Sequence, residues 1–145
     1  MFEATNLKNS GDRCSWAHAV TDHFAKQVLQ RLSENGVRVT NLIKRAYVEM
    51  PVVAPNKGSI KALVPQAFTS GAVQAALRSN GFEVEIVPIQ TWKKVAVDKG
   101  NASKEDVARV ARQRWPGLIR GYEKNQDIID ASGLLIYGET AKRRS

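Results

Sequence analysis

The spacing of apolar residues predicts an amphipathic helix close to the N-terminus. Between residues 13 and 32 the apolar positions step by three and four, which places them on one face of a helix. Ser10 or Asp12 is expected to cap the start of this helix, and Gly36 is expected to end it. A short strand is predicted before the helix, over residues 2–7. The buried face would consist of Ala17, Val20, Phe24, Val28 and Leu32.

The middle of the chain has the pattern of a strand, a helix and a second strand. The first strand lies within residues 37–48, and it should stop near Glu49 because Pro51 has no N–H to donate to a sheet. After a loop over residues 54–59, a helix is predicted over residues 59–80, in which Pro65 marks a kink or a second start. Residues 82–87 then alternate between apolar and polar, as in a strand.

The last third of the chain is predicted to be helical, in three pieces. A short helix over residues 90–97 ends in a turn at residues 98–101. Ser103 and Asp106 have the spacing of a capping box, and the helix that they start should run through Arg114. Residues 115–117, Trp-Pro-Gly, break that helix. The last helix is expected to begin at Asn125, to run to about Tyr137 and to end at Gly138.

This order of elements indicates the α/β class with a mixed or parallel sheet. No stretch rich in proline and glycine divides the chain, so residues 1–145 are predicted to form a single domain. The 145 residues suffice for a hydrophobic core without disulfides, and the one cysteine, Cys14, fits a reducing compartment. No apolar run is long enough for a membrane helix.

The charge balance favours a polyanionic partner. Lys and Arg number 22 against 14 Asp and Glu, a net charge of +8. Residues 88–124 carry nine basic and four acidic residues beside Trp92, Trp115 and Tyr122. Nucleic acid is preferred over an anionic membrane surface, because no basic amphipathic helix with large apolar anchors is evident. A solvated surface rich in lysine and arginine is the alternative.

Three carboxylates are the candidates for chemistry. Glu49 lies at the predicted end of a strand, and Asp127 and Asp130 lie three apart on the last helix, which places them on one face. Taken alone, the two aspartates are better read as ordinary acids of a helix N-terminus. With Glu49 they make a set of oxygen ligands that suits Mg²⁺ and phosphodiester cleavage.

Other chemistries find less support. The sequence contains no phosphate-binding GxxxxGK[ST] loop, no GxGxxG after a strand and no GxSxG. His18 and His23 are five apart and therefore do not share a helix face, and Cys14 has no CxxC partner.

Residues 47–138 resemble the RuvC-type Holliday junction resolvases of the RNase H-like superfamily. The resemblance rests on four stretches in this order: YVEMPVVAPN, QAFTSGAVQAAL, VEIVPIQTWKKVAVDKGNASKEDV and NQDIIDASGLLIYG. The third stretch is the most specific of them.

The resemblance implies an RNase H-like three-layer fold with a mixed sheet and a nuclease that resolves four-way DNA junctions. It implies that Mg²⁺ or Mn²⁺ is the cofactor and that the protein works as a homodimer. The implied localisation is the cytoplasm of a bacterium or of a phage-infected cell. Glu49, Asp127 and Asp130 would be catalytic residues and metal ligands. Lys93, with Lys94 as an alternative, and Lys104 would bind DNA.

The sequence departs from the family in two places. The family begins with a strand that carries an aspartate in a GIDPG-like motif, and this sequence has no such motif. The chain is therefore expected to be N-terminally truncated and to cut junctions poorly or not at all. After Glu49 the family often has an aromatic residue for base stacking, where this chain has Met50-Pro51.

Three hypotheses follow from the sequence. The first is a Mg²⁺-dependent endonuclease specific for junctions, the second a non-catalytic module of the same fold that binds branched DNA, and the third an RNase H-like nuclease acting on RNA:DNA hybrids or flaps. In a dimer, the small residues of the helix over residues 59–80 would lie at or near the contact. The alternative is that Gly71 and Ala75 pack on the chain's own sheet.

Overall fold

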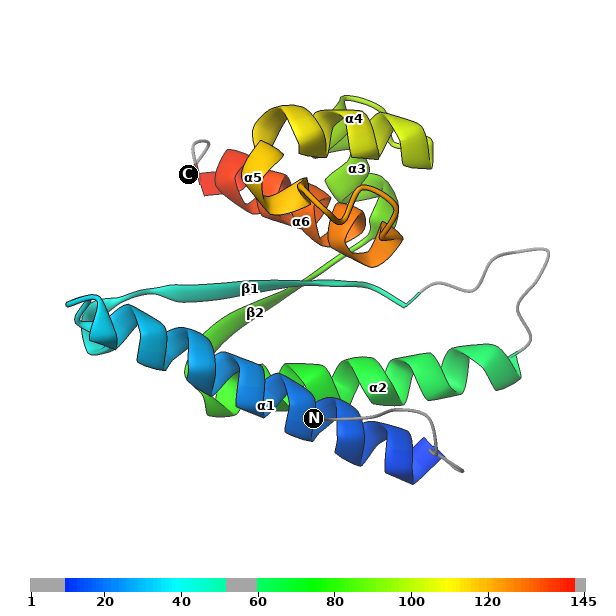
Figure 1. Cartoon of the computed structure of the whole chain (residues 1–145). Helices are drawn as coiled ribbons and strands as arrows, with labels where there is room; N and C mark the ends of the chain where they lie inside the picture. The colour runs from blue at the N-terminus through cyan, green and yellow to red at the C-terminus, as the bar shows by residue number, and fades with distance from the viewer. Residues whose placement is uncertain (1–9, 52–59, 143–145) are drawn as a thin grey trace. The chain divides into compact units, whose positions relative to one another are not determined.

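The computed structural model describes residues 10–51 and 60–142. The chain divides into two compact units, residues 1–85 and residues 86–145. The predicted strand over residues 2–7 and the loop over residues 54–59 lie outside the described residues. In chain order the elements are α1 (Ser10–Glu34), the 3₁₀ turn η1 (Val39–Asn41), β1 (Lys44–Glu49), α2 (Ile60–Ser79), β2 (Phe82–Val87), α3 (Ile89–Val97), α4 (Lys104–Arg114), α5 (Pro116–Ile119) and α6 (Gln126–Lys142) (Figure 1).

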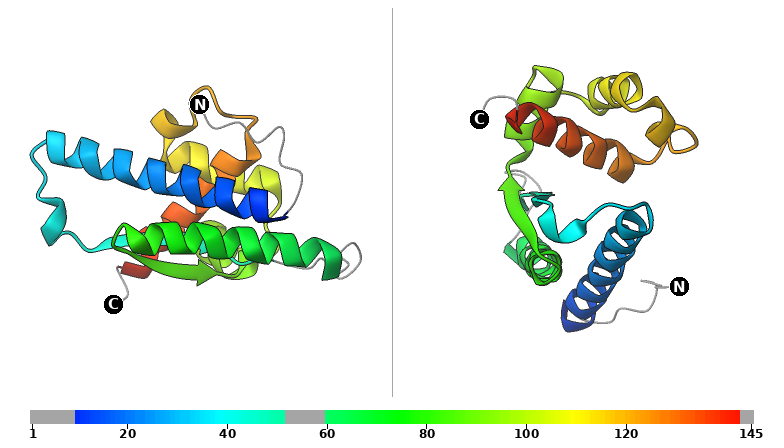
Figure 2. Two further views of the ribbon diagram at one scale, coloured as in Figure 1. Left: turned by 90° about the horizontal axis from the view of Figure 1, so that it is seen from below. Right: turned by 90° about the vertical axis from the view of Figure 1, so that its left-hand side faces the viewer.

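The first unit confirms the α/β class. Its helices α1 and α2 pack along each other (Figure 2), and β1 pairs with β2 in a two-stranded sheet. The two strands run in the same direction (Figure 1), and Arg45 Nε lies 3.2 Å from Glu83 Oε2 across them. The described residues show no further strand in this sheet, so the mixed sheet and the single domain stay predictions.

The buried face of α1 agrees with the predicted one except at Phe24: Ala17 is buried, and the other three predicted residues are half-buried. Ala17 and Ala25 are buried, whereas Phe24 is 63% exposed. Phe24 is seven residues after Ala17 and so lies nearly in line with it on the helix, whereas Ala25 lies about 80° around the helix from Ala17. On α2, Ala76 is fully buried. Small side chains allow two helices to approach closely, so the contact selects the alanines and leaves the larger phenylalanine in solvent.

Gly71 and Ala75 of α2 are exposed, and among the described residues nothing lies within 4 Å of where a Cβ on Gly71 would be. They therefore do not pack on the chain's own sheet.

Most element ends follow the predicted local signals. Gly36 and Gly81 adopt φ of +80° and +78° at the ends of α1 and α2, as their positions required. The capping box of α4 is complete: the Ser103 hydroxyl accepts a hydrogen bond from Asp106 N at 3.1 Å, and the Asp106 carboxylate accepts one from Ser103 N at 3.2 Å. Strand β2 has the predicted bounds.

Two predicted helix ends are wrong. Ser10 and Asp12 both lie inside α1, so neither caps it from outside. Gly138 does not end α6, which continues to Lys142. Gly138 is buried and its φ is not positive, so it acts as a small residue inside a packed helix.

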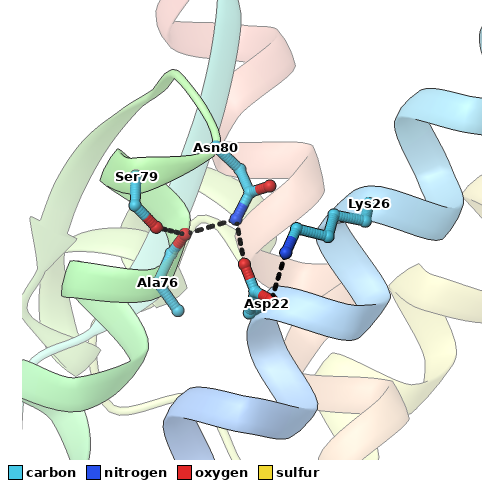
Figure 3. Close-up of polar contacts among 5 residues, drawn as sticks. All are labelled: Asp22, Lys26, Ala76, Ser79 and Asn80. Atoms are coloured by element: carbon cyan, nitrogen blue, oxygen red, sulfur yellow. Dashed lines mark hydrogen bonds and ion pairs between the residues drawn. The ribbon is translucent and has the colours of Figure 1, made fainter.

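A polar cluster ties the end of α2 to the middle of α1 (Figure 3). The Asn80 amide donates to Asp22 Oδ1 at 2.8 Å and to the Ala76 carbonyl at 2.8 Å, and Lys26 donates to Asp22 Oδ2 at 2.7 Å. These hydrogen bonds, from Lys26 first and then from Asn80, lower the pKa of Asp22. The cluster stabilises the charged carboxylate and fixes the register of the two helices.

We expect Asn80→Ala to lower the free energy of unfolding by about 1 kcal/mol at pH 7, because Asp22 and the Ala76 carbonyl each lose a donor. Because the pKa of Asp22 is lowered on folding, its contribution is present above the ordinary carboxyl pKa of about 4 and is lost as the pH falls through the lowered value. Denaturant unfolding at pH 7 and near pH 2 measures both effects.

The matched control is Ser79→Ala, which removes only the hydrogen bond from the Ser79 hydroxyl to the Ala76 carbonyl. Its effect should not change with pH. An Asn80→Ala effect as large at pH 2 as at pH 7 would contradict the role of the Asp22 carboxylate.

The second unit is built around Trp92 of α3, which is fully buried. Helix α6 packs on both α3 and α4. Gly133 of α6 lies so close to the indole that a Cβ at this position would be 2.5 Å from Trp92 Cζ3. The remaining fully buried large side chains of this unit include Val107 and Ile119. The indole of Trp92 on α3 therefore packs directly against the backbone of α6 at Gly133, and this contact determines where α6 lies.

We expect Gly133→Ala to destabilise the protein by about 1–3 kcal/mol, because the added methyl group would overlap the buried indole. Gly71→Ala is the matched control. It is also a glycine inside a helix, but no described atom lies within 4 Å of its Cβ position, so the substitution should stabilise the protein by roughly 0.5–1 kcal/mol. Thermal unfolding of the two variants should show shifts of opposite sign.

Candidate metal and nucleic-acid site

The two aspartates lie at the start of α6, as the sequence predicted. The Asn125 side-chain oxygen accepts hydrogen bonds from Asp127 N at 3.1 Å and from Ile128 N at 3.3 Å, so Asn125 caps the helix. Asp127 is exposed, and Asp130 is half-buried one turn later. Gln126 donates to Asp130 Oδ1 at 2.8 Å. This cap and the Gln126 amide hold two carboxylates on neighbouring turns of one helix.

Glu49 is the last residue of β1, which confirms its predicted place at a strand end. It is half-buried and belongs to the first unit, whereas Asp127 and Asp130 belong to the second. Within residues 10–51 and 60–142, no three Asp, Glu, His or Cys side chains form a group that could hold a metal ion. The convergence of Glu49 on the two aspartates therefore stays a prediction.

The donor set itself suits a hard cation. Asp127 and Asp130 supply carboxylate oxygens, and one oxygen of Asp130 is already engaged by the Gln126 amide. Oxygen ligands of this kind are those that Mg²⁺ prefers, and Mg²⁺ commonly needs only one or two protein carboxylates because it keeps several waters. The pair on α6 is thus chemically fit for such an ion.

The predicted DNA-binding lysines differ in their surroundings. Lys93 is half-buried, and its ammonium donates to the Ala102 carbonyl at 2.9 Å and lies 5.7 Å from the centre of the Trp92 ring. It therefore ties α3 to the segment that precedes α4. Lys94 and Lys104 are exposed, the latter at the first position of α4.

Three further basic residues gather near the start of α6. Arg112 lies on α4, and Arg120 and Lys124 lie in the turn between α5 and α6. The sequence showed the basic surplus of residues 88–124 but did not single these three out. A count of charges along the chain cannot tell which side chains share a surface.

The turn between α5 and α6 is itself well bonded. Tyr122 N donates to the Ile119 carbonyl at 2.8 Å, and Asn125 N donates to the Tyr122 carbonyl at 2.9 Å. Gly121 has a φ of +87°, and its N–H donates to the Glu123 carboxylate at 3.0 Å. The hydrogen bond from Gly121, with lesser help from the Glu123 N–H and the charge of Arg112, lowers the pKa of Glu123.

Comparison with known proteins identifies the fold. No family model and no curated protein sequence matches the chain. Among solved structures, the RuvC structure of Thermus thermophilus matches with a TM-score of 0.62 and 19% sequence identity, over 98% of this chain and 75% of that one. The chain therefore has a RuvC-like fold. None of the described helices has the length and apolar character needed to cross a membrane.

Proposed function

We propose that this protein is a Mg²⁺-dependent endodeoxyribonuclease that binds and resolves four-way DNA junctions. The observation that carries the proposal is the RuvC-like fold along 98% of the chain. The places of Glu49, at the end of β1, and of Asp127 and Asp130, at the start of α6, support it. The net charge of +8 suits a polyanionic substrate.

In this proposal Glu49, Asp127 and Asp130 hold Mg²⁺ or Mn²⁺. When bound, such an ion supplies Lewis-acid chemistry, because it lowers the pKa of a bound water and neutralises charge at the leaving 3′ oxygen. The chain's own residues orient the site: Asn125 fixes the first turn of α6, and Gln126 holds one oxygen of Asp130. Lys93, or its neighbour Lys94, together with Lys104 binds backbone phosphates and positions the DNA.

A second candidate is a module of the same fold that binds branched DNA without cutting it. One feature of the sequence favours it: residues 1–145 contain no GIDPG-like motif, the motif that carries a catalytic aspartate in the family. Cleavage through two ions requires a carboxylate that bridges them. The two candidates share the DNA partner and differ only in the chemical step.

The two candidates are separated by measuring binding and cleavage on the same labelled four-way junction. We expect binding in EDTA to be at least tenfold tighter to the junction than to a linear duplex of equal length, and only weak nicking on addition of Mg²⁺, in line with the sequence-based expectation. Glu49→Gln, Asp127→Asn and Asp130→Asn should each reduce nicking about 100-fold or more, because each removes an ionised oxygen ligand.

These three variants should keep the junction affinity within about threefold of the unsubstituted protein, since phosphate contacts dominate affinity. Binding without nicking under Mg²⁺ and Mn²⁺ would favour the non-catalytic module. Equal affinity for junction and duplex would contradict both candidates.

We also propose that the working form is a homodimer with α2 at or near the contact. Gly71 and Ala75 are exposed on α2, and so is Phe68, which is 59% exposed. An exposed aromatic beside small residues is suited to burial against a second helix.

Sedimentation velocity at micromolar concentration should therefore show a dimer, and Phe68→Glu should shift it to the monomer, because burial of a new charge is costly. Phe24→Glu, on the equally exposed Phe24 of α1, is the matched control and should leave the dimer in place. A monomeric unsubstituted protein would contradict the proposal.

A further inference from the structure

A hollow of about 360 Å³ lies in the second unit, lined by residues from α4 and from the start of α6. Its basic lining residues are Lys104, Arg112 and Lys124. A second hollow of about 380 Å³ adjoins it, because Arg112 and Glu123 line both, and Arg120 lines the second. Four cations from α4 and from the turn before α6 thus line two neighbouring depressions.

Two carboxylates, Glu105 and Glu123, also line the hollows, so the four cations are in excess by two. Glu123 is directed to its own turn: its carboxylate accepts from Gly121 N at 3.0 Å, and Arg112 contributes to the lowering of its pKa. Glu123 is therefore held in its ionised form, and its negative charge is already counted in the excess of two cations.

The cations retain donors for a ligand. Within the described part of the chain, the side chains of Lys104, Arg120 and Lys124 take part in no hydrogen bond or ion pair, and all three are exposed. The Arg112 guanidinium makes one long hydrogen bond, 3.5 Å from Nη2 to the Glu123 carbonyl, out of five N–H groups. Because the turn that carries Arg120 and Lys124 is closed by backbone hydrogen bonds, these two residues are presented on a fixed backbone.

The lining also indicates which part of a nucleic acid would fit. Among the described residues, no aromatic side chain lines either hollow, so the lining offers no platform for stacking of bases. Arginine and lysine donors without an aromatic partner suit phosphate oxygens. Two depressions that share Arg112 suit successive phosphates of one strand better than an isolated anion.

We propose that Lys104, Arg112, Arg120 and Lys124 form a basic cradle that binds the sugar–phosphate backbone of one DNA arm. This inference rests on the proposed function for the identity of the polyanion. It adds Arg112, Arg120 and Lys124 to the DNA-binding residues. The cradle positions the arm relative to Asp127 and Asp130, because the turn that carries Lys124 leads directly into the helix that carries the aspartates.

The test measures the affinity of a fluorescently labelled four-way junction in EDTA by fluorescence anisotropy, at several salt concentrations between about 50 and 200 mM. The variant is Arg120→Gln with Lys124→Gln, which removes two exposed cations and none of the hydrogen bonds that close the turn. The matched control is Arg31→Gln with Arg38→Gln. It removes the same charge from exposed residues of the first unit that line neither hollow.

We expect the cradle variant to bind roughly 10–100-fold more weakly near 0.1 M salt, with a slope of log affinity against log salt shallower by about 1–2, because two phosphate contacts are lost. The loss should be equal for junctions of different sequence. The control should stay within about threefold of the unsubstituted protein, and the charge-retaining Arg120→Lys with Lys124→Arg should restore the salt slope.

Two negative results have different meanings. If the unsubstituted protein binds no DNA, the proposed function fails and the cradle fails with it. If the protein binds the junction but the cradle variant has the affinity and salt slope of the control, the cradle is overturned and the proposed function stands. Unchanged thermal unfolding of the cradle variant, which we expect for two exposed turn residues, assigns any loss of affinity to the missing charges.

Discussion

The close fit of Trp92 against Gly133 is the constraint on which the second unit depends. The indole is fully buried, and only a residue without a side chain can face it at this distance. The contact joins α3 to α6 and so fixes where α6 lies. Since Asp127 and Asp130 occupy the first turns of α6, the position of the candidate acidic residues follows from a packing contact that contains no charged group.

Polar contacts then orient the side chains on the helices that packing has positioned. Lys93, one residue after the buried indole, uses its ammonium to hold the Ala102 carbonyl just before α4. Asn125 caps α6, and Gln126 engages Asp130. On the exposed side, Arg114 joins α4 to α6 through Glu139, with 2.8 Å between Nη2 and Oε2. Exposed pairs of this kind add little stability, so they serve mainly to orient side chains on elements that the core already holds.

In the first unit, smaller side chains determine how the helices pack. Alanines on α1 and α2 allow the two helices to lie close together, and the Asp22–Asn80 contact sets their register. Strand β1 follows and ends at Glu49, ahead of Pro51. Asp127 and Asp130 therefore stand on a helix that an uncharged packing contact positions, while most of the excess positive charge is left on exposed side chains, where solvation costs least and a polyanion can reach it.

The sequence by itself determined the elements whose signals are local. The ends of α1 and α2 at Gly36 and Gly81, the capping box of Ser103 and the stop of β1 at Glu49 each depend on residues within a few positions of one another, so pattern and turn chemistry sufficed. The stretches around Glu49 and Asp127 also pointed to the RuvC-like fold. Only the tertiary structure decided that Ala25 and not Phe24 is buried, that Gly138 continues a helix, and which cations share a surface. These outcomes depend on which element packs against which, because the space between two helices, and not the periodicity of either, selects the side chain that fits there.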